Sequence, residues 1–318
     1  LLEEALRPLP LRSVDNSAPI FRVYVLLPRH VFIGEMDALE AGYFDERAHA
    51  WTVRDAGQAT QEPAQGGKKC FCVEVPRMGL LGLFQRKDAD FPYQRFELRV
   101  AQGKGLVTLQ TRRCTLHLEF AGDAVALTAA SAGCFEDMVG QLLGVVEFLH
   151  RLSLHNVVLP FALAELAPHL RFAPKLTALQ AKAIPELVRL SRRFHVQLSW
   201  WSKECATHQL IVRTRPDRPE LERLHGDRPE DWTTLALYPN KVEALAAHER
   251  DEKFSFARAE DTLSHLTCAL LVGAHPRAFG VEEYAEHFNA EEHLQMDAMA
   301  RLLTAINLVA LTASARAG

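Results

Sequence analysis

The sequence predicts an α+β fold, with an antiparallel sheet-rich N-terminal part followed by a mixed, mainly helical C-terminal part. Two observations support this prediction. Apolar and polar residues alternate with period two through much of residues 20–127, whereas later apolar residues recur at helical spacing. The chain has 318 residues, of which 48% are hydrophobic, and this is enough to build a sizeable core.

The predicted N-terminal strands follow from β-favouring residues and from the alternation. Residues 20–27 predict the first strand. Further strands are expected at 71–75, 95–101, 106–110, 116–120 and 125–127. Glycine-containing turns at 102–105 and 122–123 predict hairpins. The stretch 55–69 has hardly any apolar anchor and is expected to be a mobile loop.

The helical predictions begin at residue 135. Apolar residues on one stripe predict a helix over 135–152, with Ser131 as its N-cap. A second helix is expected at 176–190, with Pro185 as an internal flaw. The remaining predictions are a hairpin formed by 194–200 and 209–215, a strand at 233–238, and helices at 241–252, 260–272, 281–288 and 290–311. We therefore expect a β-rich domain at 1–156, closed by the long helix, and a helix–hairpin and helical domain at 157–318.

Charge, hydropathy and cysteine usage exclude several classes of protein. The net charge of −4 gives no overall attraction to nucleic acid or to an anionic membrane. The longest apolar stretches, 266–274 and 302–311, are too short to cross a bilayer, so no membrane association is predicted. Six cysteines without a regular framework favour a reducing intracellular compartment, either the cytosol or an organelle matrix. The first residue is Leu rather than Met, which is compatible with removal of a targeting peptide.

Local motifs predict no catalytic residue, no metal and no cofactor. The glycine–lysine stretches at 66–69 and 103–105 lack the following helix that a phosphate-binding loop needs. His287 and His293 are six residues apart, whereas a zinc-binding helix places two histidines four apart. No G-x-S-x-G motif is present, and a buried structural role is the commoner one for isolated cysteines such as Cys134, Cys205 and Cys268.

The most informative feature is a basic and aromatic segment over residues 189–218. Its seven Lys or Arg residues outweigh Glu204 and Asp217 and leave a local charge of about +5. The candidate nucleic-acid-binding residues are Arg189, Arg192, Arg193, Trp200, Lys203, Arg213 and Arg215. A weaker basic cluster comprises Arg86, Lys87, Arg95, Arg99, Arg112 and Arg113. Two other interpretations remain open: arginines near a helix end complement its dipole, and the acidic C-terminal part can pair with this segment.

These features predict a non-enzymatic subunit of a larger assembly that binds RNA or associates with a ribonucleoprotein. The expected partners are single-stranded RNA, and other proteins or further copies of the chain. The apolar stretch 78–84 is a candidate docking loop. Two alternatives remain: a hydrolase or transferase whose site is assembled from distant residues, and a pure protein-interaction scaffold.

Overall fold

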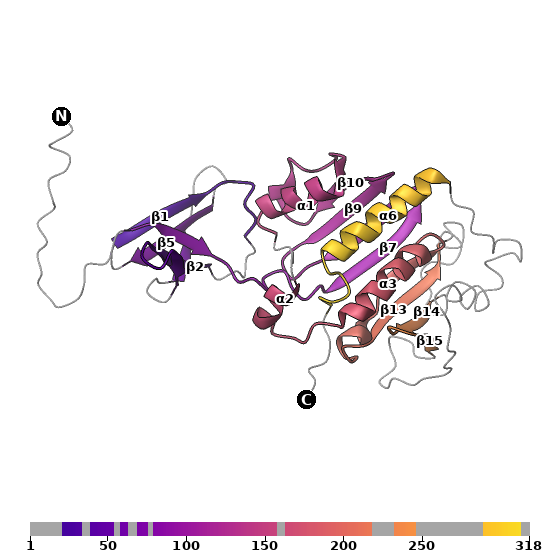
Figure 1. Ribbon diagram of the computed structural model, residues 1–318. Coiled ribbons are helices and arrows are strands. Elements are labelled where there is room, and N and C mark those ends of the chain that lie inside the picture. The colour runs from indigo at the N-terminus through magenta and orange to yellow at the C-terminus, as the bar shows by residue number, and fades with distance from the viewer. Residues whose placement is uncertain are drawn as a thin grey trace, which may run out of the picture. The chain divides into compact units, whose positions relative to one another are not determined.

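The computed structural model describes residues 21–33, 39–53, 58–62, 69–75, 79–157, 163–217, 232–245 and 289–312 (Figure 1). The described residues within 1–29 and 37–86 form one compact unit, and those within 30–36 and 87–318 form a second, larger one. Both units are built on antiparallel sheets, so the fold is α+β. Among the described residues, no helix combines the length and the apolar character needed to cross a membrane.

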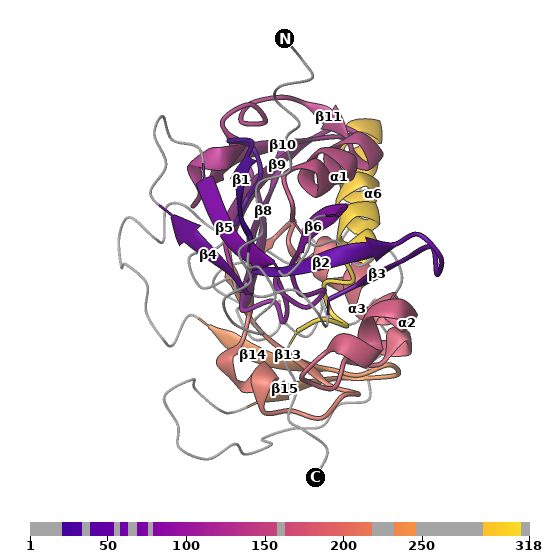
Figure 2. The same cartoon turned by 90° about the vertical axis from the view of Figure 1, so that its left-hand side faces the viewer.

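The smaller unit is a six-stranded antiparallel sheet with the order β1-β5-β4-β2-β3, in which β6 also pairs with β2 (Figure 2). Its strands are β1 (Phe21–Leu27), β2 (Leu39–Asp45), β3 (Ala50–Thr52), β4 (Gln58–Glu62), β5 (Lys69–Val75) and β6 (Leu81–Phe84). Its buried cluster comprises Ala41, Tyr43, Val73 and Val75. The strands predicted at 20–27 and 71–75 are confirmed.

Two predictions in this region are wrong. The expected loop at 55–69 contains β4, which pairs with both β5 and β2. The stretch 78–84, which the sequence predicts to be a loop, contains β6, and β6 pairs with β2. In both segments, backbone hydrogen bonds to neighbouring strands form the strand. The side chains there lack the apolar–polar alternation by which a strand is predicted from sequence.

The larger unit contains a nine-stranded antiparallel sheet with the order β11-β10-β9-β8-β7-β12-β13-β14-β15. Its strands are β7 (Arg95–Ala101), β8 (Lys104–Gln110), β9 (Thr115–Ala121), β10 (Ala124–Ala130), β11 (Leu143–Gly144), β12 (Phe194–Leu198), β13 (Leu210–Pro216), β14 (Thr233–Leu237) and β15 (Val242–Leu245). Its helices are α1 (Val145–Leu154), α2 (Leu163–Leu166), α3 (Thr177–Leu190) and α6 (Ala290–Ala305), with 3-10 turns η3 (Gly133–Phe135), η4 (Ala167–His169) and η5 (Trp200–Lys203).

Helices α1, α3 and α6 lie against one face of this sheet (Figure 1). The large core between sheet and helices contains Phe96 and Leu98 of β7 together with Leu187 of α3. Helix α6 approaches β8 closely: a Cβ built on Gly105 would lie 2.5 Å from Sδ of Met299. Glycine at this position therefore lets the helix pack directly on the strand.

The helix predicted over 135–152 begins only at Val145, so the prediction is wrong for its first ten positions, and Ser131 is not its N-cap. Gly140 has a φ of +79°, a left-handed conformation that ends any regular helix at this point. Phe135 and Met138 still reach the core, but from η3 and the turn after it. The apolar stripe thus marks buried positions here without marking a continuous helix.

The mainly helical character predicted for the C-terminal part is not confirmed. The helix expected at 241–252 is wrong over Val242–Leu245, which form β15 and pair with β14. The helices expected at 260–272 and 281–288 lie outside the described residues. The predictions of a helix at 176–190, a hairpin after it and a strand at 233–238 are confirmed by α3, β12 with β13, and β14.

The two units are divided at residues 86 and 87, whereas the sequence predicts a domain boundary at 156/157. The core of the larger unit contains residues from both sides of that predicted position, including Phe148 of α1 and Leu179 of α3. Phe32, which precedes most of the smaller unit in sequence, also belongs to this core.

Candidate nucleic-acid interface

The sheet face opposite the helices of the larger unit carries a band of polar residues over β9, β8, β7, β12 and β13. Across five neighbouring strands the register aligns His117 with Thr108, Thr108 with Glu97, Glu97 with Gln197 and Gln197 with Arg213. Residues that are partners in register point to the same face, and so do residues two positions apart in a strand. We call the resulting set of polar residues the polar face: Arg95, Glu97, Arg99, Thr108, His117, Glu119, His195, Gln197, Arg213 and Arg215.

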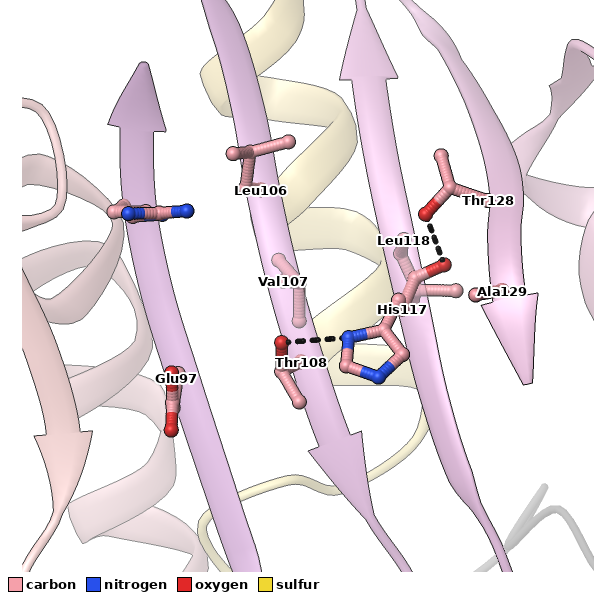
Figure 3. A pocket seen from close by; sticks show the side chains of 9 residues that line it. Glu97, Leu106, Val107, Thr108, His117, Leu118, Thr128 and Ala129 are labelled. Atoms are coloured by element: carbon pink, nitrogen blue, oxygen red, sulfur yellow. Dashed lines mark hydrogen bonds between the residues drawn. The ribbon is translucent and has the colours of Figure 1, made fainter. Parts of the chain in front are cut away.

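The polar face is hollowed above β7, β8, β9 and β10 (Figure 3). The hollow has a volume of about 490 Å³. Its lining comprises Glu97, Arg99, Leu106, Val107, Thr108, His117, Leu118, Thr128 and Ala129. Thr108 Oγ1 lies 3.2 Å from Nδ1 of His117, and the Thr128 hydroxyl donates to the His117 carbonyl at 3.0 Å. The hollow therefore presents hydroxyl, imidazole and guanidinium groups, and its lining includes no buried nucleophile.

Glu97 is the acidic residue at the centre of the polar face. Its carboxylate lies 3.2 Å from Nε2 of His195 and forms an ion pair with Arg95. The hydrogen bond with His195 is the main reason why the pKa of Glu97 lies below its usual value, and Arg95 adds to this effect while burial opposes it. Glu97 is thus held as a carboxylate among basic side chains and orders them.

Trp232 organises the two arginines of β13. The guanidinium carbons of Arg213 and Arg215 lie 4.2 Å and 5.0 Å from the centre of its indole ring. Trp232 itself is only 8% exposed, so the arginines cover it. Cation–π contacts of this kind fix the guanidinium planes in position. The two arginines are therefore ordered before any ligand arrives.

A second aromatic–basic pair lies in η5, directly after β12. Trp200 is 58% exposed, and Nζ of Lys203 lies 4.7 Å from the centre of its ring. The Lys203 ammonium also donates to the Gln94 side chain at 3.5 Å, which places η5 next to the start of β7. An exposed indole beside a positive charge is suited to stacking against an unpaired base.

The structure divides the residues predicted as the site into separate groups. Arg213 and Arg215 lie together on the polar face, and Trp200 lies with Lys203. In contrast, Arg189 in the last turn of α3 pairs with Glu186 at 2.5 Å, and Arg192 pairs with Glu292 at 3.0 Å. Arg193 is half-buried in the turn after α3, where its carbonyl accepts from the Asp217 amide at 3.0 Å.

The weaker basic cluster predicted from the sequence is divided in the structure, and Trp232 is not among the predicted residues. Arg95 and Arg99 belong to the weaker predicted cluster, and their alternation with apolar residues was the available signal. No local sequence pattern indicates that Trp232 lies beside the arginines of β13, because this position depends on the pairing of β14 with β13. Arg113 of the same weaker cluster is buried in a bidentate ion pair with Asp90 at 2.9 and 2.6 Å, so it is a core residue.

The part of the chain that the structure describes contains no group of three or more His, Cys, Asp or Glu residues arranged to hold a metal ion. No protein-family model matches the chain, and no curated protein matches it in sequence.

Proposed function

We propose that this protein is a non-enzymatic subunit of a larger assembly and that it binds single-stranded RNA through the polar face and η5. The observation that carries the proposal is the gathering of Arg95, Arg99, Arg213 and Arg215 on one sheet face, where they outnumber Glu97 and Glu119. The chain as a whole has a net charge of −4, so the local excess of positive charge on this face is opposite in sign to the net charge of the chain.

The chemistry of the polar face suits a polyanion. Arginine presents a planar fork of donors that binds phosphate oxygens in a bidentate manner. Strand β12 lies between β7 and β13, so the two pairs of arginines are separated by two strand spacings, or about 10 Å. A segment of a few nucleotides spans this distance. Trp200 supplies a stacking surface that accepts any base, which favours an unpaired strand over a duplex.

The proposed assembly also requires a surface for protein partners or for further copies of the chain. Leu142 and Val146, on either side of β11, are 61% and 79% exposed. They belong to the helix-bearing side of the chain near α1, and Val146 lines a hollow together with His150 and Arg301. Neighbouring exposed apolar residues commonly mark protein contacts. The proposed protein and RNA contacts thus use different elements.

The test is the binding of a short fluorescent single-stranded RNA, measured by anisotropy over a series of salt concentrations. We expect the intact chain to bind with strong salt dependence. Arg213→Gln/Arg215→Gln should weaken binding by tenfold or more. It should also reduce the slope of log affinity against log salt by about 0.7 for each phosphate that the variant no longer neutralises.

A matched control is Arg301→Gln, which removes one exposed arginine from α6 on the helical side. This variant should bind as the intact chain does. A second comparison is Arg189→Gln/Arg192→Gln: these arginines are already paired with glutamates, so we expect a smaller loss than for the β13 pair. Failure of the intact chain to bind at low salt, or an equal loss in the Arg301 variant, would reject the proposal. In that case the enzymatic and scaffold alternatives take its place.

A further inference from the structure

A buried lysine and a buried cysteine meet beneath η5. Nζ of Lys175 lies 3.3 Å from Sγ of Cys205 and 3.2 Å from the carbonyl oxygen of Ser202. Lys175 is 1% exposed and Cys205 is 9% exposed. The described residues place no carboxylate within ion-pairing distance of this ammonium group, so the thiol and one carbonyl are its polar contacts.

Backbone hydrogen bonds hold the pair together. The amide of Lys175 donates to the carbonyl of Ala310 at 2.9 Å, and the amide of Leu176 donates to the carbonyl of Thr207 at 2.9 Å. On the other side, Sγ of Cys205 lies 3.1 Å from the carbonyl of Ser202 and 3.3 Å from that of Gln209. The contact between nitrogen and sulfur is therefore set by two anchored segments and not by two mobile side chains.

We propose that Lys175 and Cys205 are a modification site, at which oxidation of Cys205 by hydrogen peroxide produces a covalent sulfenamide cross-link to Lys175. Burial lowers the pKa of the Lys175 ammonium, an effect that Cys205 partly opposes, and this increases the share of neutral, nucleophilic amine. Glu204, Ala206 and His208 beside Cys205 are at least partly exposed, so this loop is open to a small oxidant.

The reaction takes place in two balanced steps. The sulfur attacks one oxygen of the peroxide, the O–O bond breaks, and a sulfenic acid and one water molecule form. The nitrogen lone pair of Lys175 then attacks this sulfur, the S–O bond breaks, and the departing hydroxide takes a proton from nitrogen to form a second water molecule. Peroxide is reduced and sulfur is oxidised, and the protein loses two hydrogens. Sulfenic acids undergo the same condensation with backbone nitrogen, and thiols reverse it.

The cross-link would join the segment before α3 to the loop that follows η5, and this inference does not depend on the RNA-binding proposal. The experiment treats the full chain with hydrogen peroxide at a dose that leaves Cys114 reduced. Cys114 is a suitable indicator of intact folding, because burial raises its pKa to about 12. Tryptic peptides are then compared by mass spectrometry before and after dithiothreitol.

We expect a peptide pair joining Lys175 to Cys205 with the mass of both minus two hydrogens, together with loss of tryptic cleavage after Lys175. Dithiothreitol should restore both. A cyclic 1,3-dione that traps sulfenic acids should label Cys205 weakly in the intact chain. In Lys175→Arg, where no amine can condense, the labelling should increase severalfold.

Cys205→Ser should abolish the linked pair. Equal dione labelling of Cys205 in the intact chain and in Lys175→Arg, with no linked peptide, would overturn the proposal. So would a Cys205 that stays reduced while the more exposed Cys134 is oxidised. The absence of a linked peptide and the oxidation state of Cys205 are both read from the intact chain itself, so poor folding of a variant would not hide them.

Discussion

At the scale of single residues, Glu97 shows how a charge on a sheet face acquires a role from its neighbours. Its sequence context is an ordinary alternating strand, but His195 and Arg95 convert it into the centre of a network of polar and ionised groups. Because His195 lies 98 residues away in sequence, no local pattern indicates this contact.

The depressed pKa of Glu97 leads to a prediction about pH. A carboxyl whose pKa is lower in the folded than in the unfolded state contributes stability above the unfolded value, here about 4.5, and loses it as the pH falls through the folded value. We expect Glu97→Gln to reduce the free energy of unfolding by about 1 kcal/mol at neutral pH and by progressively less below pH 4.5. Urea unfolding at a series of pH values measures this difference. A Glu97 effect that is constant across the pH range would contradict the assignment.

The Asp90–Arg113 pair leads to a prediction about buried charge. The two side chains are 1% and 4% exposed, and they also form hydrogen bonds with the Thr111 hydroxyl and the carbonyl of Asn156, respectively. Arg113→Met leaves Asp90 buried without its cation and should lower the free energy of unfolding by about 3–5 kcal/mol. The double variant Asp90→Asn/Arg113→Met should be more stable than Arg113→Met alone, because no isolated charge remains. Denaturant unfolding of both variants tests this, and strictly additive losses would show that the pair is not coupled.

At the scale of elements, the closeness of α6 to β8 depends on the missing side chain at Gly105. Two carbonyl groups of the sheet fix the helix at the same place, because the Gln295 amide donates to Gly103 and Phe120 at 2.9 Å each. The helix therefore has little freedom to move away from an enlarged residue.

We expect Gly105→Ala to lower the free energy of unfolding by about 1–3 kcal/mol through overpacking against Met299. Met299→Val in the same chain should recover part of this loss by removing the sulfur. Gly133→Ala is the matched control: a Cβ there meets only the Glu136 carboxylate, at 3.8 Å, and its φ lies outside the left-handed region, so the stability of this variant should be nearly unchanged. Thermal unfolding compares the three. Equal losses at both glycines would mean that backbone entropy, and not the helix contact, is responsible.

At the scale of the whole molecule, the chain enters the larger core before it completes the smaller unit. Phe32 is 5% exposed, and its ring centre lies 5.7 Å from that of Phe135. Its backbone is held by His155 and Asn156, which lie at the end of α1 and directly after it. The larger unit thus depends on a segment far from most of its sequence.

Phe32→Ala should therefore destabilise the larger unit by about 3–5 kcal/mol. Hydrogen exchange resolved by peptide is the measurement: protection should fall in β7, β8 and β9, and remain in β1 and β5. Tyr43→Ala, which removes a 2% exposed side chain from the core of the smaller unit, should give the opposite pattern. A loss of protection in both units with either variant would show that they unfold as one.

Local sequence patterns are sufficient to predict the α+β class, the strands of alternating residues, helix α3 with its following hairpin, and the arginine-rich character of residues 189–218. They are sufficient because side-chain periodicity and turn residues act over a few positions. Tertiary contacts make β4 and β15 strands and place the start of α1 at Val145. They also pair Arg189 and Arg192 with glutamates and put Arg213 and Arg215 over Trp232. These outcomes depend on strand register and on contacts between residues up to about a hundred positions apart, and local periodicity carries no information about either.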